Sequence, residues 1–302
     1  MKLLLISNGI YEYDGRLREL IKIVRRLGET TYITRIDSEK SIQDDQHICI
    51  KSNTKLNYFG FIIISIITAF KMRKIDVMFV DNRKAIVPSL IIRILLKPTV
   101  IVQDVRELYF HNEVKSIHSK IGCFFEKLMI NRADILIGAN SYRTRIMKEY
   151  YQLTDEPLVY ENIRKLKFSN MICINNFQEK YKGLIKGDTF KIISTAGFDV
   201  KRTTDKLVLA MKDLGDKYEL LLVGGGSEED RAIISKIVDD YKLNNIHFIK
   251  RVGEDEMKYL IQKCDLGVVN YGKYDINNKY CASGKIYEFI FEGLPVITTE
   301  NI

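Results

Sequence analysis

The sequence lacks the features that mark metal centres, disulfide frameworks and membrane spans. Its five cysteines and four histidines are scattered and no Cys-x-x-Cys pair occurs, so neither a zinc site nor a set of disulfides is expected. The longest apolar run, Leu56 to Phe70, is shorter than the roughly 20 residues that cross a bilayer. The N-terminal stretch MKLLLIS has neither the apolar length nor the cleavage site of a signal peptide. We therefore expect a protein of the reducing cytoplasm.

Two common nucleotide-binding motifs are also missing. The loop after the first apolar run reads SNGIYEYDGR rather than Gly-x-Gly-x-x-Gly, and no P-loop sequence occurs. The net charge of +8 favours an anionic partner, such as a phosphorylated small molecule or an acidic membrane face. No basic stripe with interleaved aromatics supports nucleic acid. A solvated, lysine-rich surface explains the charge equally well.

Short apolar, β-branched runs alternate with helical patterns along the whole chain. Continuous apolar runs are typical of parallel strands buried on both faces, so the alternation predicts doubly wound α/β sheets. We expect strands to begin at Leu3, Thr31, Val77, Thr99, Asp134, Lys191, Glu219, Ile246, Leu266 and Pro295. We expect helices over 15–28, 204–214, 228–241, 254–264 and 283–292.

The alternation breaks at about 163–190, a lysine- and asparagine-rich stretch that we interpret as a connection between domains. The sequence thus predicts two Rossmann-like domains, 1–170 and 171–302, with a ligand-binding cleft between them. A final strand ordinarily has a covering helix, so we also expect a further segment after Ile302.

Four loops at expected strand ends are candidate binding segments, because ligands of doubly wound sheets bind at the carboxyl ends of the strands. They are 8–16, 195–206, 223–230 and 281–297. An ordinary strand–helix loop explains the first, and the basic residues of the second are of a kind commonly found near helices. The glycines of the third loop also have a purely structural explanation, in which they only allow another segment of the chain to pass close by.

The fourth loop has the most specific arrangement. Ser283 and Gly284 would begin a helix whose free N–H groups suit an anion, and Lys285 adds a full charge. Glu288, one turn further on, could accept two hydrogen bonds from a ribose diol. An amphipathic helix with a surface lysine and glutamate is the alternative.

The stretch 283–297 resembles the Pro-x-Lys-x-x-Glu-Tyr-x-Ala-x-Gly-x-Pro-Val-Ile signature of GT-B glycosyltransferases, specifically glycosyltransferase family 4. Glu288 occupies the place of the second glutamate of the family's Glu-x7-Glu motif, and Tyr280 occupies that of the first. The segments YDGRLRELIKIVRRLG, VQDVRELYF and HFIKRVGEDEMKYLIQKCDLGVVNY are similar to other family stretches. The resemblance therefore covers nearly the whole chain. It departs at Arg106, where histidine is usual, and at Phe198, where arginine is usual.

The resemblance implies a retaining, metal-independent hexosyltransferase that moves a sugar from a nucleotide-diphosphate donor to a glycan or lipid-linked acceptor. Its product would belong to surface polysaccharide or glycolipid synthesis, and no cofactor is implied besides the donor substrate. The expected catalytic residues are Arg202, Lys285 and Glu288. The expected donor-binding residues are Gly9, Gly15, Gly197, Lys201, Gly225, Tyr271, Ser283, Gly284 and Ile286. The expected acceptor-side residues are Asp14, Asp104 and Arg106.

Two other functions fit the same architecture: a non-hydrolysing sugar-nucleotide epimerase and a non-catalytic GT-B subunit. The acceptor also has two interpretations. An apolar helix over 59–70 followed by basic residues, and LIIRILLK from Leu90, suit a lipid-linked acceptor and peripheral contact with an anionic membrane at its cytoplasmic face. Core helices with lysine ends explain the same segments.

Overall fold

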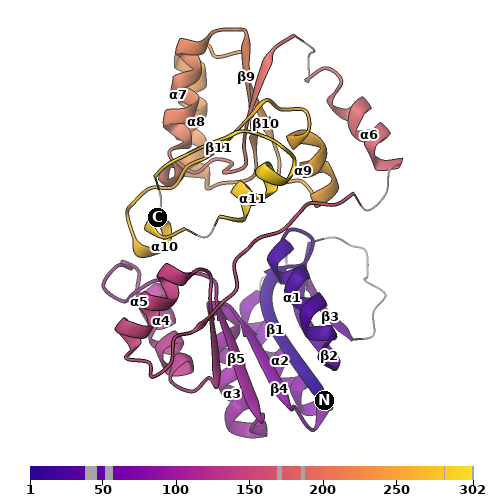
Figure 1. Ribbon diagram of the computed structural model, residues 1–302, viewed down its shortest axis with the longest axis vertical. Helices are drawn as coiled ribbons and strands as arrows, with labels where there is room; N and C mark the ends of the chain where they lie inside the picture. The colour runs from indigo at the N-terminus through magenta and orange to yellow at the C-terminus, as the bar shows by residue number, and fades with distance from the viewer. Residues whose placement is uncertain (38–45, 52–56, 169–171, 185–187, 282, 301–302) are drawn as a thin grey trace. The chain divides into compact units, whose positions relative to one another are not determined.

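The computed structural model describes residues 1–37, 46–51, 57–168, 172–184, 188–281 and 283–300. The chain forms two compact α/β units, Met1–Asn162 (unit 1) and Ile163–Ile302 (unit 2) (Figure 1). The predicted domain boundary at 170/171 lies outside the described residues. A parallel strand lies at each of the ten predicted positions, so the doubly wound α/β prediction is confirmed.

Unit 1 is built on a seven-stranded parallel sheet of order β3-β2-β1-β4-β5-β6-β7. The strands are β1 (Lys2–Ile10), β2 (Glu29–Ile36), β3 (His47–Lys51), β4 (Val77–Asp81), β5 (Val100–Val105), β6 (Ile135–Gly138) and β7 (Leu158–Val159). The helices are α1 (Gly15–Arg25), α2 (Asn57–Met72), the 3-10 helix η1 (Arg83–Ala85), α3 (Ile86–Leu96), α4 (Ile117–Ile130) and α5 (Ser141–Tyr151).

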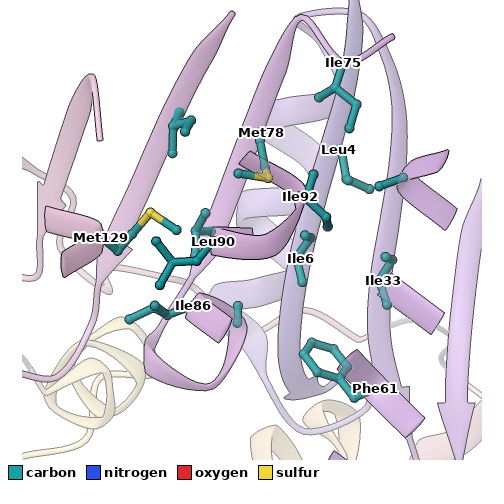
Figure 2. Packing of buried hydrophobic residues seen from close by; sticks show 14 of the residues in the cluster. Leu4, Ile6, Ile33, Phe61, Ile75, Met78, Ile86, Leu90, Ile92 and Met129 are labelled. Carbon is teal, nitrogen blue, oxygen red and sulfur yellow. The ribbon is translucent and has the colours of Figure 1, made fainter. Parts of the chain in front are cut away.

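Helices cover both faces of this sheet because successive residues of its central strand point to opposite sides. Leu4 and Ile6 of β1 pack with α2, α3 and α4, and Figure 2 shows them with Phe61, Ile86 and Met129 of that layer. The intervening Leu3 and Leu5 pack with α1 on the other face. The continuous apolar run LLLI therefore supplies two cores from one strand.

Unit 2 repeats this design with a five-stranded parallel sheet of order β10-β9-β8-β11-β12. The strands are β8 (Phe190–Ser194), β9 (Tyr218–Val223), β10 (Ile246–Ile249), β11 (Leu266–Val269) and β12 (Val296–Thr298). The helices are α6 (Ile172–Tyr181), η2 (Val200–Arg202), α7 (Thr204–Leu214), α8 (Glu228–Asp240), α9 (Glu254–Ile261), α10 (Ile276–Lys279) and α11 (Gly284–Phe291).

The two faces of the second sheet have separate cores. Ile192 of β8 packs with Val208 of α7 and Ile234 of α8, the two helices that lie side by side in Figure 1. Ile193 packs on the opposite face with Leu260 of α9 and Phe289 of α11. Phe289 can lie flat on β11 because Gly267 has no Cβ, which would stand 2.4 Å from its ring. This contact fixes the position of α11, which carries the predicted donor residues.

Several elements were not predicted, among them the helices α4, α5, α6 and α10 and the strands β3 and β7. The stretch interpreted as a plain connection contains α6, so that interpretation was wrong for residues 172–181. Its weak periodicity is compensated by tertiary contacts, because Phe177 lies against Tyr259 and the Tyr181 hydroxyl donates to Glu256 of α9 at 2.6 Å. The strands β3 and β7 lie at the two edges of their sheet, where short and partly polar strands give little apolar signal.

The apolar run near residue 60 forms α2, which confirms the predicted helix within the described residues. Across the described part of the chain, no helix combines the length and the apolarity needed to cross a bilayer.

Candidate active site

The strand order places a switch point in each sheet, where the chain leaves two neighbouring strands in opposite directions. In unit 2 this point lies between β8 and β11, and in unit 1 between β1 and β4. Loops diverge there and leave room for a ligand at the carboxyl ends of the strands. Arg202 lies in the loop after β8 and Tyr271 in the loop after β11. Arg202, predicted to be catalytic, and Tyr271, predicted to bind the donor, are therefore both at the switch point of unit 2.

Three side chains from separate segments meet at this point. The Arg202 guanidinium lies over the Tyr271 ring, 5.0 Å from its centroid, in a cation–π contact. The Tyr271 hydroxyl donates a hydrogen bond to Oγ of Ser283 at 3.1 Å. Burial raises the pKa of Tyr271 to about 12, so the phenol keeps its proton and remains a donor. The Nε of Arg202 also lies 3.3 Å from Oδ2 of Asp199. This ion pair helps to hold the guanidinium in position.

The start of α11 is arranged as the sequence predicts. Ser283 is the N-cap residue, yet its side chain does not cap the helix, because its Oγ is the partner of Tyr271. Gly284 is the buried first helical residue, and Ile286 packs partly into the core. A helix start without a side-chain cap leaves backbone N–H groups for an anion.

Glu288, expected to accept hydrogen bonds from a ribose, is fully buried. One carboxylate oxygen accepts a hydrogen bond from Arg164, and the other accepts one from Lys285 at 3.0 Å. Lys285 is 32% exposed, so its ammonium lies between this carboxylate and solvent. Sequence reasoning missed Arg164, which also approaches Glu254 at 3.9 Å, because it lies in the stretch interpreted as a connection.

The glycines of the second and third loops contact each other. Gly197 has φ +65°, and a Cβ there would stand 2.2 Å from the carbonyl oxygen of Gly225. The amide of Phe198 donates to that same oxygen at 2.9 Å. These glycines thus allow close passage of two loops, which was the structural interpretation of the third loop.

Two neighbouring positions differ in exposure. Phe198, at the family's usual arginine position, is buried and stacks on Phe248 with ring centroids 4.9 Å apart. Lys201 is exposed within η2. Of the two neighbouring basic residues Lys201 and Arg202, it is Arg202 that contacts Tyr271.

In unit 1, the predicted acceptor-side residues come together in a buried charge network. Arg106 donates to Asp14 at 2.6 Å and to Asp81 at 2.7 Å. Arg16 donates to Asp104 through Nε at 3.1 Å and through Nη2 at 2.8 Å. Asp14, Asp104 and Arg106 were predicted, whereas Asp81 and its role were missed. The available signal was that Asp81, like Asp104, lies at the carboxyl end of a buried strand.

Asp81 is the most deeply buried carboxylate of this network. It accepts a hydrogen bond from Ser7 at 2.5 Å, and burial raises its pKa to about 6 against the opposing effect of Arg106. Gly9 lies beside it on β1, where a Cβ would stand 2.8 Å from Asp14, and Gly15 is the first residue of α1. Both predicted glycines thus belong to the packing around this network.

Within the described residues, no cluster of three or more histidine, cysteine or acidic side chains has the geometry to hold a metal ion.

Comparison with known families decides the class of unit 2. Residues 175–300 match the sequence profile described as Glycosyl transferases group 1. This part of the chain belongs to the group 1 glycosyltransferases. The matched segment contains Arg202, Tyr271, Ser283, Lys285 and Glu288, whereas Arg164, the partner of Glu288, lies before it. The protein is accordingly a glycosyltransferase.

Solved structures with the same fold span nearly the whole chain. HepE from Anabaena, solved with UDP-glucose, has 13% identity and a TM-score of 0.70 over 99% of this chain and 80% of its own. Sucrose-phosphate synthase from Thermosynechococcus elongatus has 16% identity and a TM-score of 0.68 over 99% and 81%. A structure described as a putative UDP-N-acetylglucosamine 2-epimerase from Listeria monocytogenes has 12% identity and a TM-score of 0.61 over 98% and 78%. At these identities the likeness establishes the GT-B fold. A comparison with curated protein sequences gives no match.

Proposed function

We propose that this glycosyltransferase transfers a hexosyl group from a nucleoside-diphosphate sugar with retention of anomeric configuration. The observation that carries the proposal is the convergence of Arg202, Tyr271 and Ser283 at the switch point of the group 1 domain. A nucleotide diphosphate there would meet a guanidinium, a helix start and the Lys285 ammonium. HepE, a structure of the same fold, was solved with UDP-glucose, which makes a UDP-hexose the first donor to test.

During sugar transfer, negative charge develops on the leaving diphosphate. As the glycosidic bond breaks, the bonding electron pair leaves with the diphosphate, and Arg202 and Lys285 stabilise the growing negative charge. The acceptor hydroxyl forms the new glycosidic bond on the same face, and its proton passes to the departing phosphate oxygen. Because these cations supply the required charge, the reaction needs no metal ion. Arg106 is not the base, since a guanidinium held by Asp14 and Asp81 has no proton to give up at neutral pH.

Glu288 takes part through an exchange of partners. The ribose hydroxyls replace Lys285 on its Oε2, and the released ammonium turns toward the diphosphate. Arg164 remains on Oε1 and keeps the carboxylate fixed during the exchange.

The acceptor side lies in unit 1, and the acceptor is a lipid-linked sugar or glycan of a surface polysaccharide or glycolipid. The protein works in the cytoplasm with peripheral contact to an anionic membrane. The support is the exposed apolar face of α2, where Phe59 is 63% exposed and Ile67 is 49% exposed, followed directly by Lys71, Arg73 and Lys74.

The experiment is donor-dependent release of nucleoside diphosphate, after a thermal-shift panel of UDP, GDP, dTDP and ADP sugars has identified the donor. Arg202→Ala and Glu288→Gln should each lower the release rate roughly a hundredfold or more. The first removes the positive charge at the leaving diphosphate, and the second removes the negative charge that binds the ribose. Lys236→Ala, an exposed change on α8, is the control and should leave the rate unchanged. Addition of EDTA should also leave it unchanged.

Three outcomes would contradict the proposal. Full activity in both variants would remove Arg202 and Glu288 from the mechanism. Donor binding without release would indicate a non-catalytic subunit, an alternative favoured by the occupation of both Glu288 oxygens. Conversion of the sugar nucleotide in the absence of any acceptor would indicate an epimerase.

A further inference from the structure

Unit 1 contains a cavity of about 710 Å³ at its own switch point. Asn8, near the end of β1, and Arg83 and Lys84, just after β4, line it. Tyr58 of α2 and Ile121 of α4 line it as well. The cavity thus occupies the edge of the sheet where doubly wound folds bind ligands. It is lined by none of the acceptor-side residues predicted from the sequence.

The charged side chains that line the cavity are all positive. Arg35, Arg83 and Lys84 contribute to the lining, and no aspartate or glutamate is among its described residues. Arg83 is paired with the buried Glu126, whereas Lys84 is exposed and makes no ion pair within the described part of the chain. The first turn of α4 adds the positive end of a helix dipole, with the Ser119 N–H already donating to Oγ of Ser116 at 3.1 Å and the earlier N–H groups left for an anion. The lining therefore favours an anion.

Part of the lining is apolar, beside the polar Asn8 and Ser119, and this apolar part continues onto the surface. Val87 and Phe125 lie in the cavity, while its rim residues Tyr58 and Ile121 are 41% and 50% exposed. From the rim, exposed apolar side chains follow one face of α2 at four-residue spacing and one face of α4. They are Phe59, Ile63 and Ile67 on α2, and Ile117 and Phe124 on α4. Such surfaces mark contact with apolar partners, so a chain bound in the cavity has an apolar path out of it.

We propose that this cavity binds the lipid-phosphate portion of the acceptor. The phosphate is bound by Lys84 and the start of α4. The hydrocarbon chain lies over Tyr58, Ile121 and Phe125 and leaves along the apolar face of α2. The assignment of this ligand as the acceptor rests on the proposed function, whereas the binding of an anionic amphiphile does not.

The test uses a fluorescent reporter at the rim. The sequence contains no tryptophan, so Tyr58→Trp gives a full-length protein with a single tryptophan at the cavity. Decyl phosphate below its micelle concentration should bind saturably and shift the emission to shorter wavelength. In the same background, Lys84→Ala should weaken binding roughly tenfold or more, because a charge-assisted hydrogen bond is lost. Lys127→Ala, an exposed change on the same α4 outside the cavity, should leave the affinity unchanged.

Two matched ligands separate the possible sources of binding. Decyl maltoside carries the chain without the charge, and inorganic phosphate carries the charge without the chain; each should bind at least tenfold more weakly than decyl phosphate. Equal binding of either one, or no effect of Lys84→Ala, would overturn the proposal. Calorimetric titration of the unmodified protein with decyl phosphate repeats the measurement if Tyr58→Trp fails to fold. The titration contains no nucleotide, so its result stands apart from any failure of the donor assay.

Discussion

At the scale of single residues, the donor loop depends on Gly197. Its φ of +65° lies in the left-handed region that side chains rarely adopt, and its missing Cβ makes room for the carbonyl oxygen of Gly225. Gly215 has a similar φ of +74°, but nothing lies within 4 Å of the Cβ position. An added Cβ would therefore cause both backbone strain and a steric clash at Gly197, but backbone strain alone at Gly215.

We expect Gly197→Ala to lower the free energy of unfolding by about 3 kcal/mol, since strain and clash act together. Gly215→Ala should cost only about 1 kcal/mol, from strain alone. Urea denaturation followed by circular dichroism measures both. Equal costs would mean that the two donor loops are not in contact.

Glu126 gives unit 1 a pH-dependent stability. Burial raises the pKa of this carboxyl to about 7 against the opposing charge of Arg83. A pKa raised by folding means that the folded state binds the proton more tightly than the unfolded state. The resulting stabilisation is fully present below the ordinary pKa of a glutamate and is lost as the pH rises through about 7.

We therefore expect the free energy of unfolding of Glu126→Gln to fall less than that of the unmodified protein between pH 5 and pH 8. The difference should be on the order of 2 kcal/mol. Denaturation at a series of pH values measures it, with the exposed Glu149→Gln as the control. Parallel pH profiles for Glu126→Gln and the unmodified protein would contradict this role of burial.

At the scale of elements, α2 is unusual because its exposed face is apolar. The 16-residue helix carries no charge before Lys71, and Phe59, Ile63 and Ile67 are all exposed. Its opposite face, with Phe61 and Ala69, belongs to the core shown in Figure 2. Apolarity on both faces made the sequence ambiguous between a core helix and a surface-docking helix, and the exposed fractions favour the second interpretation.

We expect the protein to sediment with anionic vesicles at low salt and to be largely released at high salt, because the neighbouring basic residues supply part of the attraction. Ile63→Glu should weaken vesicle binding roughly tenfold or more, since it removes apolar area and adds repulsion. Leu209→Glu, a comparable exposed change on α7 of unit 2, should have no effect. Absence of binding at any salt concentration would refute membrane contact.

Element prediction succeeded where local pattern and burial agree. The runs at β1, β8 and β9 are buried on both faces, and their strands lie where predicted. The helix α6 was missed because its sequence is weakly periodic and contacts such as Phe177 with Tyr259 come from distant parts of the chain. Local propensity carries no information about such contacts.

At the scale of the whole molecule, each unit has its own hydrophobic cores, and the donor residues all lie in unit 2 apart from Gly9 and Gly15. A ligand stabilises only the cooperative unit that binds it. We expect the donor nucleotide to raise the unfolding temperature of one transition and leave the other in place.

Differential scanning calorimetry with UDP or the donor found by the panel measures this effect. At a hundredfold excess over the dissociation constant, the stabilisation should be about 2.7 kcal/mol. Arg202→Ala should abolish the shift and identify the responsive transition as unit 2. A shift in both transitions would mean that the two units unfold together.

The sequence by itself determined the alternation of strands and helices, the loops at strand ends, and the family signature that contains Lys285 and Glu288. These are local patterns, set by the spacing of apolar residues, glycines and caps along a few turns of chain. Only the tertiary structure decided which charges meet. Glu288 is paired with Arg164, 124 positions away, and Arg106 with Asp14, 92 positions away. A buried charge must find a partner, but its choice of partner depends on the folded sheet, which brings distant strand ends to one edge.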